Sequence, residues 1–349
     1  MFPLLDQKGH VWSQYRKSRQ QQHAEFGEID SSLYGNQHQF SFVVENTFAL
    51  VLTPVSTHEL GGRKMMQTGA FTGFEVELRE PGIAWIEFNT PERLNGLTQA
   101  IKRDLVETIT QAQMDNKVRV LVFTGQGRAF CAGDDISGQG KAIGGEPLVP
   151  PIPPGHDSDI GTYEGLRVLS QTLNTAIRSC DKISIAAVNG VAIQTGMSMA
   201  LSCDFRIAAE SARLGSATLR FGLLPDEGGQ YLLVQMIGVP RTLDFLINKK
   251  IATAEECLDL GLVHEVVPND DLQTRAMAFA TEIANGPQVA TRLLKRSIYN
   301  AYDLSWEQSL DEIAAKTAVS DHHADAREGG LAFREKRNPD FNSWLSGES

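Results

Sequence analysis

Hydrophobic and polar positions begin to follow a regular pattern at about Phe74. The segment FEVELREPGIAWIEFN, residues 74–89, contains two runs rich in β-branched and aromatic residues, separated by a Pro-Gly pair. Runs of this kind form strands, and a Pro-Gly pair favours a turn between them. We therefore predict a β-hairpin over residues 74–89.

A helix and further buried strands are expected after the hairpin. In the next segment apolar residues recur at helical spacing, at Leu97, Ile101, Leu105, Ile109 and Ala112. The segment VRVLVFTG that follows has the continuous apolar run that is typical of a strand buried on both faces. The alternation continues with a helix at about 163–180, a strand at 182–190, a helix from about Met197 and a strand at 204–210.

The later part of the chain and one internal segment depart from this alternation. After Gly238 the pattern is almost entirely helical, including a helix that starts at Ser305 with a Ser-x-x-Gln capping box. Residues 138–161 are rich in glycine and proline, which block both helix and sheet pairing. They predict a long surface loop of the kind that often covers a site.

The N-terminal segment is polar and only weakly periodic. Met65 and Met66 lie just before the first strong strand pattern, which suggests a native start at these methionines. The pattern as a whole predicts three regions: an N-terminal extension of unknown role over 1–72, a core over 73–260 and a helical region over 261–349.

The composition is that of a globular protein. Of the 349 residues, 42% are hydrophobic and 21% are charged, which predicts one packed core with extensions. The 43 acidic and 32 basic residues give a formal net charge of −11. This charge opposes binding to nucleic acid and to anionic membranes, so an anionic ligand needs a local basic patch. No apolar stretch reaches membrane-spanning length and no export signal is visible, so we expect a cytoplasmic protein.

Cysteine and histidine patterns give no metal site. The four cysteines, Cys131, Cys180, Cys203 and Cys257, are far apart and form no CxxC pair, which predicts free thiols. Cys131 is a candidate nucleophile, but no sequence feature supplies its base. His322 and His323 are adjacent rather than on one helical face, so they predict neither a metal site nor a catalytic triad.

Several segments occur in the order that is typical of one family. The most informative are GRAFCAGDDIS, ending at Ser137, and AAVNGVAIQTGMSMALSCD, ending at Asp204; the others are TPERLNGL at 90–97, GLLPDEGG at 222–229, GLV at 261–263 and FREKRNPDF near the end. Together they resemble the enoyl-CoA hydratase/isomerase (crotonase) family over roughly Phe74 to Trp344. The resemblance implies an α/β fold with a spiral core of repeated β-β-α units and a C-terminal helical layer. It also implies a role in lipid metabolism, an acyl-CoA substrate with no cofactor beyond its coenzyme A, and a homotrimer or a dimer of trimers.

The resemblance assigns an oxyanion hole to the backbone amides of Asp134 and Thr195. A thioester carbonyl becomes an enolate-like oxyanion when its α-carbon loses a proton, and amides fixed at a turn and at a helix N-terminus stabilise that charge. The family usually has glycine where Thr195 stands, so the β-branched side chain is expected to narrow the pocket. The alternative is that the neighbouring glycines only permit tight strand-to-helix turns.

The two glutamates that activate water in the family's hydratases are missing. Ser198 and Thr218 stand at their positions, and a hydroxyl does not act as a general base near neutral pH without help. Asp226, in LLPDEGG, matches a position where several family members bring a carboxylate to the acyl chain. We therefore predict that Asp226 moves the proton in converting 3-enoyl-CoA to 2-enoyl-CoA. Glu227 is a weaker candidate for the same role.

Four alternatives remain open for this site. The enzyme could be a hydratase with rearranged groups or an acyl-CoA hydrolase, and a non-enzymatic protein that binds CoA or acts as a scaffold is also compatible with the missing glutamates. Asp226 could instead cap the helix that begins at the glycine pair after it, since aspartate is a favoured N-cap.

Contacts to the substrate are implied by the same resemblance. Backbone around Arg93 and Leu94 and the carbonyl of Ala132 are expected to meet the adenine end, and Arg93 could also pair with a phosphate. Phe333 and Lys336 match positions that reach the nucleotide from a neighbouring subunit and supply a local cation. The full set of substrate-binding residues that we predict is Arg93, Leu94, Ala132, Asp134, Asp135, Ile136, Thr195, Phe333 and Lys336.

Overall fold

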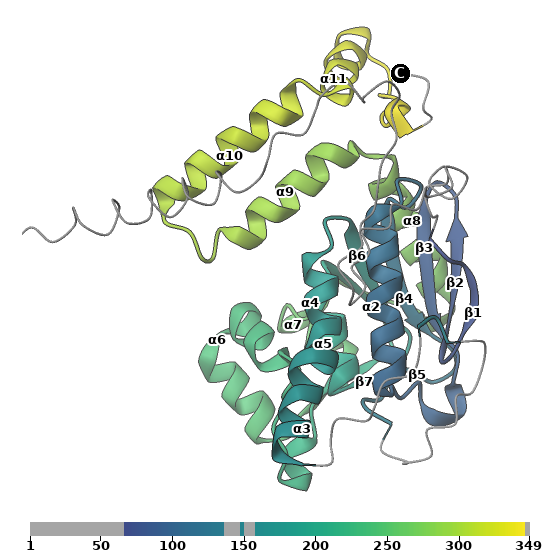
Figure 1. The fold of residues 1–349 in the computed structure, drawn as a ribbon, viewed down its shortest axis with the longest axis vertical. Helices are drawn as coiled ribbons and strands as arrows, with labels where there is room; N and C mark the ends of the chain where they lie inside the picture. The colour runs from purple at the N-terminus through teal and green to yellow at the C-terminus, as the bar shows by residue number, and fades with distance from the viewer. Residues whose placement is uncertain (1–65, 136–146, 150–157, 346–349) are drawn as a thin grey trace, which may run out of the picture. The chain divides into compact units, whose positions relative to one another are not determined.

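A seven-stranded sheet forms the framework of the protein (Figure 1). The structure is a computed structural model that describes residues 66–135, 147–149 and 158–345. The strand order in this sheet is β1-β2-β3-β4-β6-β8-β11. The first three strands are antiparallel and the remaining pairs are parallel. The strands are β1 Gly69–Phe71, β2 Phe74–Arg79, β3 Ile83–Phe88, β4 Val120–Gly125, β6 Ile183–Val188, β8 Phe205–Ala209 and β11 Glu265–Val267.

The predicted hairpin is confirmed. β2 and β3 pair from Phe74 opposite Phe88 to Arg79 opposite Ile83. Gly82 in the turn has a φ of +113°, and a Cβ there would lie 2.4 Å from the carbonyl oxygen of Lys117. Both the backbone conformation and the lack of space therefore require glycine.

A second sheet of four strands, in the order β10-β9-β7-β5, gives the fold its repeat. Its strands are β5 Ala129–Cys131, β7 Val191–Ile193, β9 Arg213–Gly215 and β10 Ile251–Thr253. Along the chain, β4, β6 and β8 of the large sheet are each followed by one short strand of the small sheet and then by helix. This repetition of strand, strand and helix confirms the predicted β-β-α architecture.

Both faces of the large sheet are buried, as its apolar runs predict. On one face Leu121 and Phe123 pack against α2, which spans Gln99–Met114 and buries Leu105 completely. On the other face Val120 and Val122 pack against three alanines of α8, Leu272–Asn285 (Figure 1). Burial of side chains of this size contributes about 1.5–3 kcal/mol each, so β4 and its neighbours hold the two layers together.

The remaining helices connect the strands or follow the sheets. They are α3 Asp159–Glu164, the π-helix η3 Gly165–Ser170, α4 Gln171–Ser179, α5 Thr195–Ser202, α6 Gly229–Ile247, α7 Ala254–Asp259, α9 Gln288–Asn300, α10 Trp306–Asp321 and α11 Ala324–Glu335. The short 3-10 helices are η2 Pro91–Arg93, η4 Thr218–Phe221, η5 Asn269–Asp271 and η6 Ser343–Leu345. The capping box predicted at Ser305 is confirmed at the start of α10. The helix expected from about Met197 begins two residues earlier, as α5.

The structure departs from the predicted pattern at several boundaries. The strands β10 and β11 fall in the part predicted to be almost entirely helical, because each has only three residues and no visible alternation. β11 pairs with β8 and α8 covers the sheet, so the sheet core continues beyond residue 261. At the other end, the amide of Met66 donates to Asp115 Oδ2 at 2.8 Å and β1 pairs with β2, so the core starts before residue 73.

Two predicted segments lie wholly or partly outside the described residues. The N-terminal extension up to residue 65 and most of the predicted loop 138–161 belong to this group. The described end of that loop already contains the start of α3, whose N-cap is Ser158. In the described part of the chain no helix is long and apolar enough to cross a membrane.

Candidate active site

Two parallel strand ends lie side by side at the centre of the candidate site. β5 pairs with β7, with Cys131 opposite Ala192, and each strand runs into a turn that contains a glycine. Gly133 has a φ of +111°, and a Cβ on Gly196 would lie 2.0 Å from the carbonyl oxygen of Cys131. The positive φ therefore favours glycine at position 133, and the close approach of the Cys131 carbonyl requires it at position 196.

The backbone amides of Asp134 and Thr195 are unpaired at these turns. Within the described part of the chain neither amide donates to another protein group, although the amides of Asp135 and Gln194 beside them are bonded. Thr195 is the first residue of α5, where an amide has no partner inside the helix. The Thr195 hydroxyl donates to Asp134 Oδ1 at 2.6 Å, so the structure brings the two residues into contact.

Gln194 links this turn to Asp226. Its φ of 51° is unusual for a residue other than glycine, and its side chain is held at both ends. Ser216 Oγ donates to Gln194 Oε1 at 2.6 Å, and Gln194 Nε2 donates to Asp226 Oδ1 at 3.3 Å. The half-buried Asp226 is thereby fixed beside the residue that precedes Thr195.

Asp226 does not cap the helix that follows it. The N-cap of α6 is Gly228, with a φ of 90° and no side-chain capping bond. The main-chain carbonyl of Asp226 accepts from Gln171 Nε2 at 2.9 Å, which fixes the turn from α4. The capping interpretation of Asp226 is therefore wrong, and its carboxylate has Gln194 as its side-chain partner.

A buried cation lies beside the same turns. Lys102, on α2, has a fully buried side chain whose Nζ lies 2.7 Å from Asp134 Oδ1 and 2.5 Å from Glu227 Oε1. It also donates to Ser170 Oγ at 3.0 Å. Burial raises the pKa of Glu227 while Lys102 opposes the shift. Burial lowers the pKa of Lys102, whereas the carboxylates of Glu227 and Asp134 together raise it by more. The pKa of Lys102 therefore lies above its ordinary value, and Lys102 keeps its charge.

Lys102 was not predicted from the sequence. It lies next to Ile101 on α2, where only the apolar residues show the helical periodicity that indicates a buried face. The sequence signal that pointed to a buried cation was the pair of carboxylates in the GRAFCAGDDIS and GLLPDEGG motifs, Asp134 and Glu227. Two such carboxylates need a compensating cation if they are buried together. Nothing in the spacing shows that the two motifs converge on α2.

The residues at the two hydratase positions have different surroundings. Ser198 is buried in α5, and a Cβ on Gly229 would lie 2.6 Å from its Oγ. Thr218 is half-buried at the start of η4, with its Oγ1 3.2 Å from Ser216 Oγ. Each position therefore carries a hydroxyl that packs against protein groups.

The expected CoA contacts divide into two groups. Arg93 and Asp135 form an ion pair at 2.5 Å, so the guanidinium that was expected to meet a phosphate already has a carboxylate partner. The carbonyl of Leu94 accepts from the amide of Ala132 at 2.9 Å, so these residues lie together beside the Asp134 turn. Ile136 lies outside the described residues.

Phe333 and Lys336 are not brought to the site within one chain. Phe333, on α11, is 85% exposed, and Lys336 is the C-cap of the same helix. Figure 1 shows α11 at the opposite end of the fold from β5 and β7. The expected contact of these residues with the nucleotide therefore depends on a neighbouring subunit.

The cysteines are buried free thiols. Burial raises the pKa of Cys131 to about 12, so the thiol is neutral at physiological pH. This environment disfavours Cys131 as a nucleophile. The described residues contain no group of three or more His, Cys, Asp or Glu side chains that could hold a metal ion.

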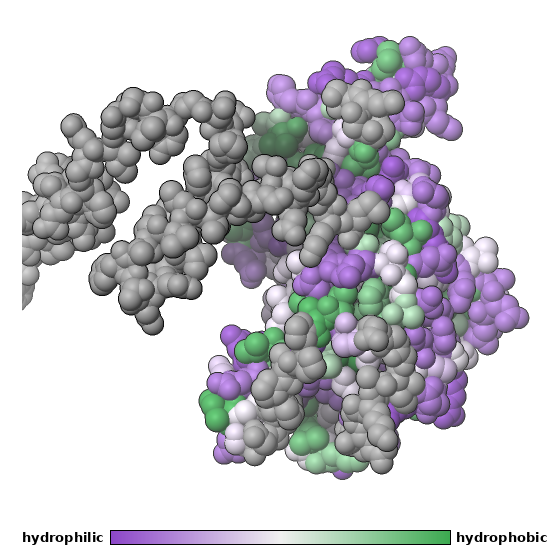
Figure 2. Space-filling model, turned by 45° about the vertical axis from the view of Figure 1, so that its right-hand side comes forward, coloured by the Kyte–Doolittle hydropathy of each residue, from purple (hydrophilic) through white to green (hydrophobic). Residues whose placement is uncertain are grey.

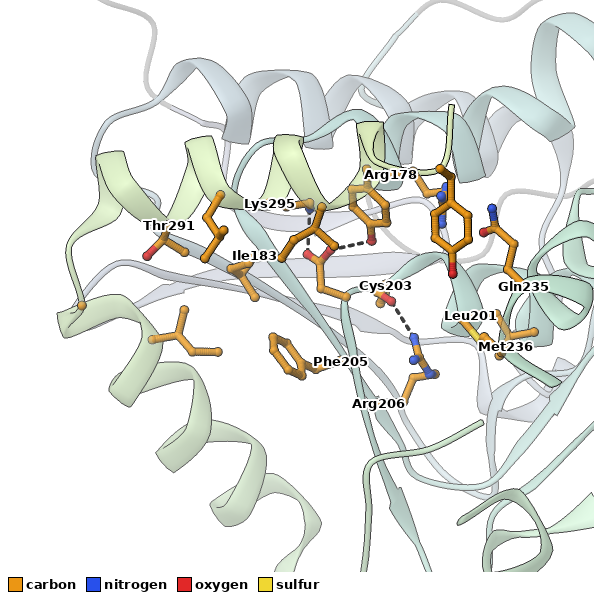
Figure 3. Close-up of a pocket in the computed structure, with 17 residues that line it drawn as sticks. Arg178, Ile183, Leu201, Cys203, Phe205, Arg206, Gln235, Met236, Thr291 and Lys295 are labelled. Carbon is orange, nitrogen blue, oxygen red and sulfur yellow. Dashed lines mark hydrogen bonds and ion pairs between the residues drawn. The ribbon is translucent and has the colours of Figure 1, made fainter. Parts of the chain in front are cut away.

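Two cavities near α5 share Arg178 in their linings. One, of about 540 Å³, lies between α9 and the strands β6 and β8 and is lined mainly by apolar side chains (Figure 3). In its wall Asp204 accepts from both Lys295 and Tyr299 at 2.7 Å. The other cavity, of about 270 Å³, is lined by Asp226 and Glu227 with residues of α4 and α6. The smaller cavity is the one that adjoins the candidate chemistry.

Comparison with known proteins identifies the family of the chain. The family model described as Enoyl-CoA hydratase/isomerase matches residues 79–147 and 155–344. The chain belongs to this family. The relatives of this enoyl-CoA hydratase/isomerase family member include a "Probable enoyl-CoA hydratase" of Rhodobacter capsulatus, which is 34% identical over 74% of this chain and 94% of the relative. A "1,2-epoxyphenylacetyl-CoA isomerase" of Escherichia coli is 32% identical over 75% of this chain and 95% of the relative.

Solved structures share the fold. A crystal structure of an enoyl-CoA hydratase from Bacillus anthracis is 30% identical, with a TM-score of 0.70, and covers 77% of this chain and 98% of that one. An enoyl-CoA hydratase structure from Geobacillus kaustophilus is 29% identical, with a TM-score of 0.69, over 78% of this chain and 98% of that one. Hydratases and an isomerase thus both occur among the relatives, so membership of the family leaves the reaction open.

Proposed function

We propose that this protein is an enoyl-CoA isomerase in which Asp226 moves the proton. The observation that carries the proposal is the contact of Asp226 with Gln194, which precedes Thr195 in the chain; the Thr195 amide has no hydrogen-bond partner among the described residues. A carboxylate base is thereby held beside two unpaired amides. The hydratase positions hold only the hydroxyls of Ser198 and Thr218.

The reaction needs one base and one site for negative charge. Asp226 takes a proton from the α-carbon of a 3-enoyl-CoA, the electrons move into the thioester carbonyl, and the amides of Asp134 and Thr195 stabilise the dienolate oxygen. Asp226 exchanges this proton with solvent water and then protonates the γ-carbon, which gives 2-enoyl-CoA with no net gain or loss of atoms. Each oxyanion donor contributes about 10²–10³ in rate, and a positioned base contributes about 10²–10⁴. Coenzyme A takes part only as a portion of the substrate.

A hydratase is the second candidate. The Rhodobacter capsulatus relative is named as a probable enoyl-CoA hydratase, and Glu227 provides a second carboxylate beside Asp226. The contact of Glu227 with Lys102 and its burial argue against a role as the water-activating base. The isomerase therefore has the stronger support.

Turnover in deuterated water tests the proposal. We expect a 3-enoyl-CoA to become a 2-enoyl-CoA that carries deuterium, with no free CoA and no hydrated product, as followed by mass spectrometry. Asp226→Asn is expected to lower kcat by about 10²–10⁴-fold, since the amide cannot accept the proton. Asp244→Asn, on the exposed side of α6 where Asp244 pairs with Lys250 at 3.6 Å, is the matched control and should keep full activity.

The other outcomes separate the alternatives. Release of free CoA would identify a hydrolase, and a hydroxyacyl-CoA product would identify a hydratase. An Asp226→Asn enzyme with unchanged kcat would remove Asp226 from the mechanism. A wild-type protein that binds CoA but turns over none of these thioesters would support the non-enzymatic alternative.

A further inference from the structure

Lys102 is a fully buried cation that has no role in the steps of the proposed reaction. Its ammonium group contacts one carboxylate from each of the two turns that build the site, Asp134 and Glu227. The partial exposure of Asp134, at 44%, contrasts with 1% for Glu227 and 0% for Lys102. Burying a charged lysine is costly unless its partners compensate it, so this arrangement needs an explanation beyond packing.

Lys102 contacts the side chain that links the two residues of the proposed oxyanion site. Asp134 Oδ1 accepts from the Thr195 hydroxyl at 2.6 Å and lies 2.7 Å from Lys102 Nζ. A single oxygen atom thus joins the side chains of the two residues whose amides are unpaired. Because the Asp134 side chain is held at this atom, rotation of its backbone away from Thr195 would break both contacts.

Charge gives Lys102 a second effect. The Asp134 carboxylate belongs to the same residue as an amide that is proposed to stabilise the oxyanion. Without Lys102, this negative charge would lie close to the oxyanion. Two like charges so close together repel each other, and the repulsion is strongest where water is excluded. Lys102 offsets this charge and at the same time that of Glu227, which is bonded to Asp226 in the chain.

We propose that Lys102 is a positioning residue for the reaction. It holds the Asp134 and Thr195 amides in a fixed relation, ties them to the turn that carries Asp226, and offsets the carboxylates of Asp134 and Glu227. The inference rests on the proposed function, because it assigns the two amides to the oxyanion.

Lys102→Met tests the proposal, because methionine keeps much of the length and removes the charge. We expect kcat to fall by about 10²-fold, comparable to the loss of one oxyanion donor, with KM changed by less than about threefold. The double variant Lys102→Met with Asp134→Asn should have a kcat at least about tenfold higher than Lys102→Met alone. The asparagine side chain still accepts a hydrogen bond from Thr195 and carries no charge that Lys102 would have to offset.

Lys182→Met is the matched control for the loss of a buried lysine. Lys182 is also fully buried, and its Nζ donates to the carbonyls of Ala112 and Asp115 at the far end of α2. This variant should lower thermal stability and leave kcat within about twofold, because no partner of Lys182 lies at the site.

Acetoacetyl-CoA gives a readout that does not depend on turnover. Its α-carbon is acidic, and an oxyanion site that stabilises its enolate increases the near-ultraviolet absorbance of that enolate. Wild-type protein should promote the enolate, Lys102→Met should not, and the double variant Lys102→Met with Asp134→Asn should regain it. The inference fails if Lys102→Met folds and keeps its kcat and enolate signal, if Lys182→Met loses as much kcat, or if wild-type protein gives no enolate signal. A wild-type protein that forms the enolate but isomerises nothing contradicts the proposed function alone.

Discussion

At the scale of single residues, adjacent carboxylates in one turn have different environments. Asp226 is half-buried and accepts from an amide nitrogen of Gln194, whereas Glu227 is buried against the Lys102 ammonium. Glu227 Oε2 has no hydrogen-bond partner in the described part of the chain. A carboxylate that is to exchange protons with a substrate needs access, and this condition favours Asp226. Burial and pairing suit Glu227 to fixing the turn.

The environment of Glu227 predicts a pH dependence of stability. Burial raises its pKa in the folded protein above the ordinary 4.5, although Lys102 opposes the shift. Above pH 4.5 the unfolded chain therefore releases a proton that the folded protein still holds, so the unfolding free energy falls as pH rises through the folded pKa. Glu227→Gln removes this titration and keeps the shape of the protonated carboxyl.

Urea unfolding of both proteins between about pH 4.5 and pH 8 measures the effect, because titrations shared by the two proteins cancel in the difference. We expect the unfolding free energy of wild type minus that of Glu227→Gln to decrease as pH rises, with a slope of at most about 1.4 kcal/mol per pH unit. A difference that stays constant or increases would show that Glu227 is ionised throughout.

Main-chain features of the site could be predicted from sequence, whereas the side-chain network could not. The resemblance to the family assigns the amides of Asp134 and Thr195, and the glycines next to these residues mark two tight turns that depend on local sequence. The contact of Lys102 with Asp134 and Glu227 joins residues far apart in the chain, and which side of α2 lies over the two turns is set by tertiary packing. Helical periodicity gives the buried face of α2 and leaves the direction of a long side chain at its edge undetermined.

At the scale of elements, the start of α6 packs directly on α5. Gly229 begins α6 over the buried Ser198, with space for a hydrogen but not for a methyl group. This contact places the turn with Asp226 beside the first turn of α5. The serine at the hydratase-glutamate position is therefore in direct contact with the start of α6.

Gly229→Ala tests that contact. The added Cβ would lie 2.6 Å from Ser198 Oγ, so we expect the unfolding free energy to fall by about 1–3 kcal/mol. Ser198→Ala removes the clashing oxygen, and in that background Gly229→Ala should cost at least about 1 kcal/mol less. The four proteins of this double-mutant cycle can be compared by urea unfolding. Additive effects would contradict direct contact between the two elements.

The longer elements were predictable because each carries its own periodic signal. The hairpin β2–β3 and the helix α2 contain complete patterns of alternating or helically spaced apolar residues. The strands β10 and β11 have three residues each, and their pairing with β9 and β8 is decided by contacts distant in sequence. Short strands of this kind lie below the length at which periodicity separates a strand from a turn.

At the scale of the whole molecule, several large apolar side chains of the C-terminal helices are exposed. α10 has no buried residue, although it packs beside α9. Figure 2 shows hydrophobic patches between hydrophilic areas on one face of the molecule. Contiguous apolar surface usually marks an interface. The large apolar residues most exposed on α9, α10 and α11 are Leu294, Ile298, Trp306, Leu310, Val319 and Phe333.

These helices lead to a prediction about assembly and CoA binding. Because the resemblance to the family implies a trimer, we expect the protein to sediment at about three times the 38.3 kDa chain mass, or at a multiple of this trimer, with the exposed apolar side chains covered in the assembly. In such an assembly Phe333 of one subunit can contact the adenine of a substrate bound to its neighbour. Stacking of a base on an aromatic ring contributes about 1–3 kcal/mol, so Phe333→Ser should raise KM for an acyl-CoA by about tenfold. An acyl-pantetheine lacks the nucleotide, and its KM should not change.

The comparison of the two substrates decides where Phe333 acts. An equal rise of KM for acyl-CoA and acyl-pantetheine would mean that Phe333→Ser alters the fold or the acyl site, and an unchanged KM for both would remove Phe333 from the nucleotide site. Sedimentation of the variant at the wild-type mass is required for the test, because loss of the assembly would also weaken CoA binding. A wild-type protein that sediments as a single chain would contradict the prediction, since Phe333 lies on α11, at the opposite end of the fold from its own chain's β5 and β7 (Figure 1).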